Sequence, residues 1–247
     1  MNNSILSIQN LCVNYITPGN PVKAVNDVSF EIQQGEIFGL VGESGSGKST
    51  VVQAVLRTLP PPAVIKGGKV LINNKDILSL SNTDVLQYRW KQISIVMQSA
   101  LNALNPVLTI REQIKDVLEI HSDLTGKAVD NRIHELFSLI DIDVSRLDSY
   151  PHELSGGMRQ RAVIAIALAL MPPLIIMDEP TTALDVIVER EILAKIIELR
   201  KELGFTILFI THDLNLLLEF ADHLAIMKNG KVIELGQTQK IRAGGEH

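Results

Sequence analysis

Four apolar runs divide the chain, and each is too short to cross a membrane. Runs of this length are typical of strands that are buried on both faces of a parallel sheet. The runs are Ile37–Val41, Ile93–Met97, Leu174–Met177 and Phe205–Ile210. Apolar residues at helical spacing occupy much of the sequence between them, so the pattern predicts an α/β fold.

A second pattern, strict alternation of apolar and polar residues, marks the N-terminal part of the chain. Residues Ile5–Tyr15 and Ala24–Ile32 alternate in this way, and the turn residues Pro18 to Pro21 lie between them. This arrangement predicts an antiparallel pair of strands. Gly67-Gly68 is expected to open a further strand over Lys69–Ile72. Together these segments predict a small antiparallel sheet.

Helical spacing of apolar residues predicts several helices and helix ends. The expected helices cover Ile110–Ile120, Val129–Ile140, Arg159–Leu170 and a long amphipathic segment that follows Asp185 and ends at Gly204. Ser155 is a natural N-cap for the third of these helices. Near the C-terminus, Asn229-Gly230 separates two short apolar segments, which predicts a closing hairpin.

Composition narrows the class of protein. The chain has 247 residues, 46% of them hydrophobic, and a net charge of −5, which argues against nucleic acid as the main partner. Its single cysteine, Cys12, excludes an internal disulfide framework and a cysteine-ligated metal cluster. The N-terminus shows no signal peptide, and the longest apolar run, Ala162–Pro173, is too short to span a bilayer. We therefore expect a cytoplasmic protein.

A glycine-rich segment follows the first buried run and precedes a helix-compatible run. Its residues are Gly42, Glu43, Ser44, Gly45, Ser46, Gly47, Lys48, Ser49 and Thr50. Glycines in this context let backbone amides converge on phosphate oxygens at the N-terminus of a helix. Lys48 would reach the β- and γ-phosphates, and the Ser49 hydroxyl would bind Mg²⁺. The alternative, a glycine-rich turn without function, does not explain this strand-to-helix context.

Polar residues follow each of the other buried runs, where parallel strands collect ligands. Asp178 is placed to hold Mg²⁺, and Glu179 to polarise an attacking water molecule. Gln98 is placed to meet the nucleotide or its metal, and His212 could hydrogen-bond a γ-phosphate. These residues predict a Mg²⁺-dependent nucleoside triphosphatase.

Two further features have more than one interpretation. Tyr15 ends a predicted strand upstream of the glycine-rich segment, where it could stack on adenine or only pack within the sheet. Ser155, Gly156 and Gly157 could form a second anion cradle at a helix N-terminus, or only a helix cap. The sequence chemistry leaves both choices open. The apolar loop Ser99–Pro106 favours contact with a partner over local packing.

These motifs, in this order, resemble the nucleotide-binding subunit of an ABC transporter over essentially the whole chain. The motifs are Gly42 to Thr50, Gln98, Leu154 to Met158, Asp178-Glu179, Ala183 to Asp185 and His212. The resemblance implies a P-loop NTPase (RecA-like) core with an N-terminal antiparallel β subdomain and an inserted α-helical subdomain. It places all 247 residues in one ABC ATPase domain: the β subdomain at about 1–35 and 67–80, the helical subdomain at about 100–165, and the core in the remainder.

The resemblance also assigns roles. It implies that ATP is held by residues 42–50, that Tyr15 stacks on adenine, and that Ser49, Gln98 and Asp178 hold Mg²⁺. Glu179 would be the base and His212 the γ-phosphate sensor. Residues of the signature motif and Asp185 would act across a head-to-tail dimer with a second, identical or related, ATPase subunit. The signature residues are Ser155, Gly156 and Gly157.

The segments Met97–Pro106 and Ser155–Arg161 narrow the resemblance to importers of the oligopeptide, dipeptide and nickel group. The resemblance implies three things about partners: permease subunits in the membrane, an extracytoplasmic solute-binding protein as an indirect partner, and no nucleic acid. It also implies a peripheral location on the inner face of the membrane. Such subunits often carry a C-terminal extension, and we expect one to be cut or naturally short here. The alternative is a soluble accessory ATPase, as in carbon–phosphorus lyase systems.

Overall fold

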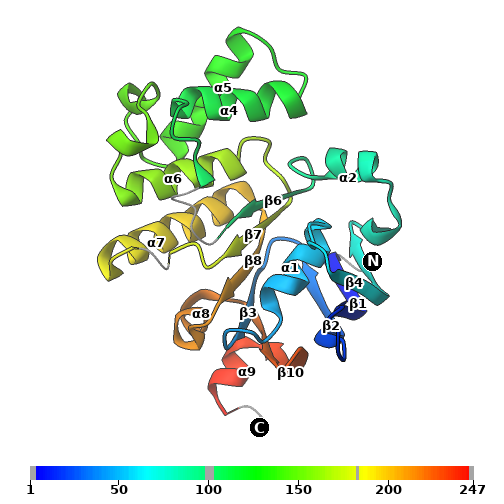
Figure 1. The fold of residues 1–247 in the computed structure, drawn as a ribbon. Helices are drawn as coiled ribbons and strands as arrows, with labels where there is room; N and C mark the ends of the chain where they lie inside the picture. Colours follow the sequence, from blue (N-terminus) through cyan, green and yellow to red (C-terminus); the bar gives the residue numbers. More distant parts are fainter. Residues whose placement is uncertain (1–3, 98–102, 182–183, 245–247) are drawn as a thin grey trace. The chain divides into compact units, whose positions relative to one another are not determined.

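The computed structural model describes residues 4–97, 103–181 and 184–244 (Figure 1). The chain divides into two compact units. Unit 1 contains residues 1–89 and 206–247, and unit 2 contains residues 90–205. Each unit is described by itself below.

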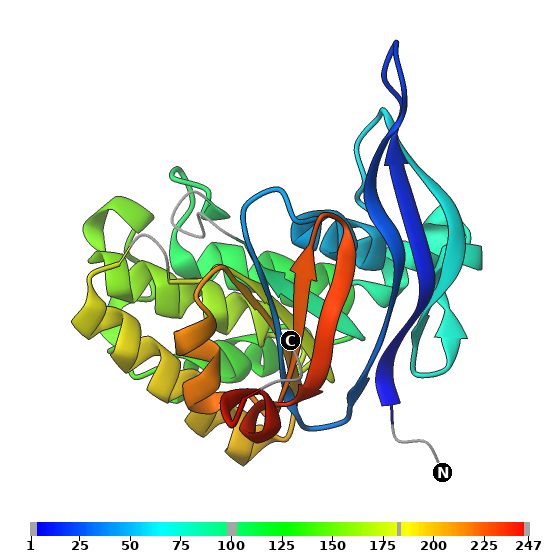
Figure 2. The same ribbon diagram turned by 90° about the horizontal axis from the view of Figure 1, so that it is seen from below.

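Unit 1 contains an antiparallel sheet with the strand order β2-β1-β4-β5. The strands are β1 (Ser4–Tyr15), β2 (Val22–Gln33), β4 (Ala63–Ile72) and β5 (Lys75–Asp76). The long strands β1 and β2 lie side by side in Figure 2, so the predicted antiparallel pair is confirmed. One face of this sheet is apolar because alternate residues of β2, Val28, Phe30 and Ile32, are buried. In β1, the consecutive residues Ile5–Ile8 are all buried.

Strand β4 corrects one prediction. Gly67 and Gly68 lie inside this strand and do not open it, because β4 already begins at Ala63. The register between β1 and β4 shifts between Gln9 and Cys12, opposite the glycines. Gly68 has a φ of +97°, and a Cβ atom there would lie 2.6 Å from the carbonyl oxygen of Asn10. The glycines therefore allow β1 to approach at an irregularity in the ladder.

The parallel strands of unit 1 surround β3. Strand β3 (Ile37–Gly42) pairs in parallel with β8 (Thr206–Thr211) on one side and with β9 (His223–Lys228) on the other. Strand β10 (Lys231–Gln237) then runs antiparallel to β9. The predicted closing hairpin is confirmed: Asn229 and Gly230 both have positive φ values, 50° and 76°, as a tight two-residue turn requires.

Short helices complete unit 1. They are α1 (Lys48–Leu56), the 3₁₀ turn η1 (Ile77–Ser79), α2 (Asn82–Tyr88), α8 (Leu214–Phe220) and α9 (Thr238–Arg242). Helices α1 and α8 both contact β3, and α9 contacts β9 and β10. Because β3 is covered in this way, its residues Phe38 and Leu40 are fully buried. This burial explains the continuous apolar run in the sequence.

Unit 2 combines two parallel strands with a helical layer. Strands β6 (Ile93–Val96) and β7 (Leu174–Asp178) pair so that Val96 lies opposite Met177. The helices are α4 (Ile110–His121), α5 (Lys127–Leu139), η2 (Val144–Arg146), η3 (Pro151–Glu153), α6 (Gly156–Ala167) and α7 (Val186–Leu203). Helix α6 contacts β6, α4, α5 and α7, and its alanines make such close packing possible.

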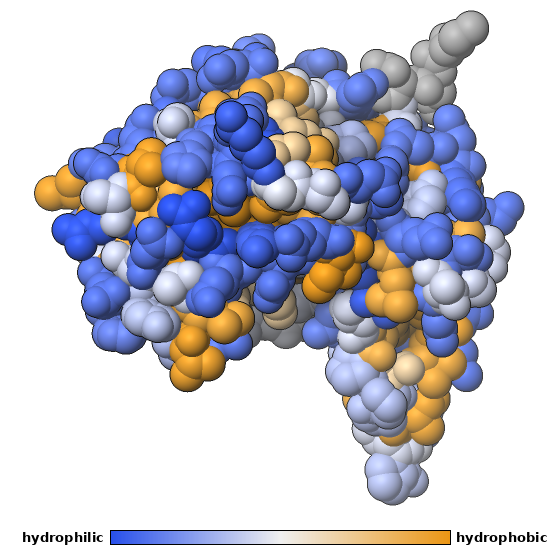
Figure 3. All heavy atoms as spheres, turned by 90° about the horizontal axis from the view of Figure 1, so that it is seen from above, coloured by the Kyte–Doolittle hydropathy of each residue, from blue (hydrophilic) through white to orange (hydrophobic). Residues whose placement is uncertain are grey.

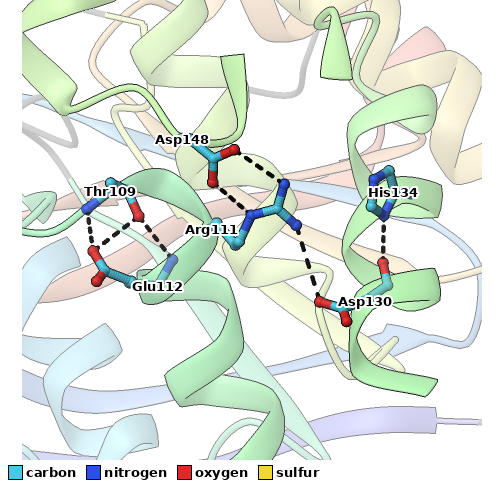
Figure 4. A network of polar contacts seen from close by, with 6 residues as sticks. All are labelled: Thr109, Arg111, Glu112, Asp130, His134 and Asp148. Atoms are coloured by element: carbon cyan, nitrogen blue, oxygen red, sulfur yellow. Dashed lines mark hydrogen bonds and ion pairs between the residues drawn. The ribbon is translucent and has the colours of Figure 1, made fainter. Parts of the chain in front are cut away.

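An ion-pair network joins the helices of unit 2 (Figure 4). The Arg111 guanidinium on α4 binds Asp148, with 2.6 Å between Nε and Oδ1, and reaches Asp130 on α5 at 4.0 Å. The hydrogen bond from Arg111 holds the pKa of the Asp148 carboxyl below its usual value. Thr109 and Glu112 form a capping box at the start of α4, and those hydrogen bonds lower the pKa of Glu112.

The surface mixes apolar and charged side chains, as the face in Figure 3 shows. The most exposed large apolar side chains include Val107, Ile120, Val186 and Ile187, all in unit 2. No helix in the described parts of the chain is both long enough and apolar enough to cross a membrane.

Candidate functional site

The glycine-rich segment connects β3 to α1 in unit 1, as the sequence predicts. Gly45 and Gly47 have φ values of +79° and +105°, in the left-handed region that favours glycine. A Cβ atom on Gly47 would lie 2.4 Å from the carbonyl oxygen of Ala24, and one on Gly42 would lie 2.3 Å from that of Met227. The backbone path of the loop therefore requires glycine at these positions.

The side chains of the loop are arranged for an anion. Lys48 is 6% exposed, and its ammonium group donates hydrogen bonds to the carbonyl oxygens of Gly42 (2.7 Å) and Glu43 (3.0 Å). The buried hydroxyl of Ser46 has no hydrogen-bond partner among the residues that the structure describes. Buried polar groups normally have partners, so this hydroxyl and the nearby ammonium fit a bound phosphate. Ser49 is exposed at the start of α1, where a metal ion could reach its hydroxyl.

Two other predicted site residues lie in unit 1. Tyr15 ends β1, and its hydroxyl lies 3.5 Å from the Thr50 hydroxyl at the start of α1. His212 is exposed directly after β8. The register pairs Val41 with Thr211, so His212 and the glycine-rich loop leave neighbouring strands at the same edge of the sheet. Unit 1 thus brings Tyr15, residues 42–50 and His212 to one region.

The predicted acids end β7 in unit 2. Asp178 and Glu179 are both half-buried. Glu179 has a φ of +46°, a left-handed conformation that is uncommon for a residue with a side chain. Such strain is found most often at functional sites. The predicted Gln98 lies outside the described residues.

Ser155 begins α6, and its predicted role as N-cap is confirmed. Its hydroxyl accepts a hydrogen bond from the amide of Met158 at 3.3 Å. The helix starts at Gly156, three residues before the predicted Arg159. The amides of Gly156 and Gly157 are among the first amides of the helix, which have no partner within it. The role of these residues as an anion cradle stays a prediction.

A hollow of about 370 Å³ lies beside this cap, between α6 and α7, and we call it the α6–α7 pocket. Its lining residues are Ser155, Gly156, Gly157, Met158, Arg161, Leu184, Asp185, Val188 and Glu191. A Cβ atom on Gly157 would lie 2.8 Å from Cγ1 of Val188, so glycine allows the two helices to approach. The structure therefore brings four predicted site residues, Ser155, Gly156, Gly157 and Asp185, into one pocket.

Three charged residues line the α6–α7 pocket. Asp185 caps α7 and accepts hydrogen bonds from the amides of Ile187 and Val188, both at 3.1 Å. Arg161 and Glu191 form an ion pair across the two helices at 3.6 Å. This pair was not predicted from the sequence, although Arg161 follows Gly157 by four residues and therefore lies on the same side of the helix.

Within the described residues, no group of three or more histidine, cysteine or acidic side chains could hold a metal ion by itself. Mg²⁺ in phosphate-transfer sites is usually held by one or two protein ligands together with water and the phosphates. The exposed Ser49 hydroxyl and the Asp178 carboxylate are ligands of that kind.

Comparisons with known proteins agree with this geometry. A sequence family described as ABC transporter matches residues 25–182. The oligopeptide transport ATP-binding protein OppD of Bacillus subtilis is 40% identical over 96% of this chain and 67% of its own length. The dipeptide transport ATP-binding protein DppD of Bacillus subtilis is 41% identical over 98% of this chain and 73% of its own length.

A solved structure shows the same fold. It is the dimeric post-hydrolysis state of the ATP-binding cassette MJ0796 bound to ADP and phosphate, with a TM-score of 0.82 and 28% identity. The alignment covers 94% of this chain and 98% of that one. The likeness confirms the predicted P-loop NTPase fold.

Proposed function

Because the chain belongs to the ABC transporter family, we propose that it is the subunit that hydrolyses ATP to energise an importer of peptides or similar small solutes. Family membership makes the chain an ATP-binding ATPase of the ABC type. The observation that supports the proposal most directly is the loop from Gly42 to Thr50, with its buried ammonium group and its partnerless hydroxyl. The names of OppD and DppD support peptides as the solute.

The residues of each unit have distinct roles in the proposal. Residues 42–50 hold the phosphates of ATP, with Lys48 neutralising the β- and γ-phosphates, and Tyr15 contacts the adenine. Ser49, Gln98 and Asp178 are the proposed Mg²⁺ ligands, and the metal would neutralise charge on the phosphates. Glu179 accepts a proton from the attacking water, and His212 hydrogen-bonds the γ-phosphate. Catalysis of this kind depends on positioning and on charge stabilisation.

The proposed working form is a head-to-tail dimer. Ser155, Gly156 and Gly157 of one subunit bind the triphosphate that the other subunit holds, and Asp185 contacts the partner. This arrangement explains why one chain carries two sites suited to anions. Whether the second subunit is identical or related does not alter the chemistry of the site.

Coupling to transport requires further partners in the proposal. They are permease subunits in the membrane, which would place the ATPase on the inner face, and a solute-binding protein that acts through them. The loop after Gln98 would contact the permease. Purification from detergent extracts tests this: we expect integral membrane proteins to be recovered with the chain. Recovery with a soluble enzyme complex alone would contradict an importer and favour an accessory ATPase.

The Glu179→Gln variant tests the catalytic assignment. An amide cannot accept the proton of the attacking water, so hydrolysis should fall by at least about 100-fold, while ATP binding is retained and a dimer accumulates. The measurements are steady-state phosphate release and size-exclusion chromatography with ATP. Glu202→Gln, at an exposed position of α7, serves as the control and should keep its turnover. Undiminished turnover in Glu179→Gln would remove Glu179 from its role.

A further inference from the structure

The α6–α7 pocket has an unexpected charge for a site that should receive a phosphate. Its charged lining residues are one cation, Arg161, and two carboxylates, Asp185 and Glu191. The formal charge of the lining is therefore −1. Asp185 has a structural task, because its carboxylate caps α7. Glu191 caps no helix, and its ion pair within the described part of the chain is with Arg161.

The geometry of the Arg161–Glu191 ion pair allows an incoming anion to replace Glu191 as the partner of Arg161. Its atoms are 3.6 Å apart, and the Glu191 side chain is 59% exposed, whereas that of Arg161 is 22% exposed. The guanidinium also donates a hydrogen bond to the carbonyl oxygen of Ile140, at 3.4 Å, so it has a second acceptor besides Glu191. Long, exposed ion pairs of this kind are weak. An anion that enters the pocket can therefore compete with Glu191 for the guanidinium.

We infer that Glu191 sets how tightly the α6–α7 pocket binds the triphosphate of ATP held by the opposite subunit, because it competes with that anion for Arg161. The inference rests on the proposed composite site, and it adds a residue that weakens triphosphate binding at that site. Glu191 is a positioning residue in this scheme and does not touch the reacting atoms. Its negative charge favours opening of the dimer after hydrolysis, which a transport cycle requires.

The direction of the effect separates this role from a structural one. Glu191→Gln keeps the size of the side chain and removes its charge, so Arg161 becomes available to the phosphate. The ATP concentration that gives half of the maximal dimer should then fall by about two- to fivefold, the range expected for an exposed ion pair. Loss of a purely structural contact would leave that concentration unchanged or raise it.

A second ion pair on α7 supplies a matched control. Lys195 binds Asp141 at 2.9 Å, and the Asp141 side chain is also 59% exposed. Neither residue lines the α6–α7 pocket. Asp141 lies in the turn after α5. Asp141→Asn therefore removes a carboxylate of equal exposure that pairs with α7, and it should leave ATP-dependent dimerisation unchanged.

The experiment measures dimerisation by light scattering against ATP concentration in the Glu179→Gln background, and against a non-hydrolysable analogue in the wild-type background. Glu191→Gln, Glu191→Ala and Asp141→Asn are compared, with thermal unfolding as a check on folding. The gain should disappear when Arg161 is also changed to Gln, and it should shrink as salt is raised from 50 to about 500 mM.

Three results would overturn the inference. They are an unchanged or higher half-maximal ATP concentration in both Glu191 variants, an equal gain in Asp141→Asn, and a gain that persists without Arg161. If neither background forms a dimer with nucleotide, the composite site itself is wrong. That outcome differs from failure of the inference, because it would be seen in proteins that retain Glu191.

Discussion

At the scale of single residues, backbone conformation limits substitution in the phosphate loop more than side-chain chemistry does. Gly45 and Gly47 share a positive φ, but only at Gly47 would a Cβ atom meet backbone, the carbonyl oxygen of Ala24 at 2.4 Å. Around Gly45 there is open space. A side chain at Gly47 would therefore meet both steric contact and backbone strain, whereas a side chain at Gly45 would meet backbone strain alone.

Gly47→Ala should consequently abolish nucleotide binding, because the loop must move away from Ala24 and its amides lose their alignment. Backbone strain alone costs about 1–3 kcal/mol, and the steric contact adds to it. Gly45→Ala should lose only the free energy that corresponds to the backbone strain. Thermal unfolding and titration with a fluorescent ATP analogue would compare the two variants. Equal melting temperatures and equal affinities would contradict the steric argument.

At the scale of elements, the Arg111 network stabilises the helical layer of unit 2 in a pH-dependent way. Arg111 lowers the pKa of Asp148 in the folded chain, so the ionised carboxylate favours the folded state. This contribution is fully present above the usual aspartate pKa of about 3.9 and is lost as pH falls through the lower, folded-state pKa.

Asp148→Asn should therefore lower the melting temperature by about 1–3 °C at pH 7, since exposed ion pairs are weak. The difference from wild type should shrink below about pH 4, where the wild-type carboxyl also becomes protonated. Glu119→Gln, which removes the exposed pair between Lys115 and Glu119, serves as the comparison. Calorimetry between pH 3 and 7 measures both, and a difference that is independent of pH would contradict the network.

At the scale of the whole molecule, the proposed catalytic residues are divided between the units. The phosphate loop, Tyr15 and His212 belong to unit 1, whereas Asp178, Glu179 and the α6–α7 pocket belong to unit 2. The proposed dimer adds a second division, because the pocket of each chain serves the phosphate loop of the other. The sharing of each composite site between two chains can be tested by mixing variants.

Ser155→Arg should abolish hydrolysis and leave ATP binding to the isolated chain intact, because the pocket acts on the partner's nucleotide. Lys48→Ala should abolish binding to its own loop. In an equal mixture of these two inactive variants, about half of the dimers are mixed and each has one intact composite site, so phosphate release should reappear at about a quarter of the wild-type rate. Loss of ATP binding in monomeric Ser155→Arg would contradict the assignment in trans.

The sequence by itself determined the features that depend on neighbours along the chain. The buried runs, the phosphate loop, the N-cap at Ser155, the turn at Asn229-Gly230 and the helix end at Gly204 all follow from local pattern and backbone chemistry. Long apolar runs and turn residues have few alternative uses, so these predictions agree with the structure, except that β6 ends at Val96 and leaves Met97, which was predicted within a buried run, 57% exposed.

Only the tertiary structure decided the features that depend on contacts between distant segments. Gly67 and Gly68 lie within β4 because β1 approaches them there. The Arg161–Glu191 pair exists because α6 and α7 pack together, and Glu179 adopts a left-handed conformation that its sequence neighbours do not require. Local pattern cannot specify such features, because they arise from packing between residues far apart in the chain.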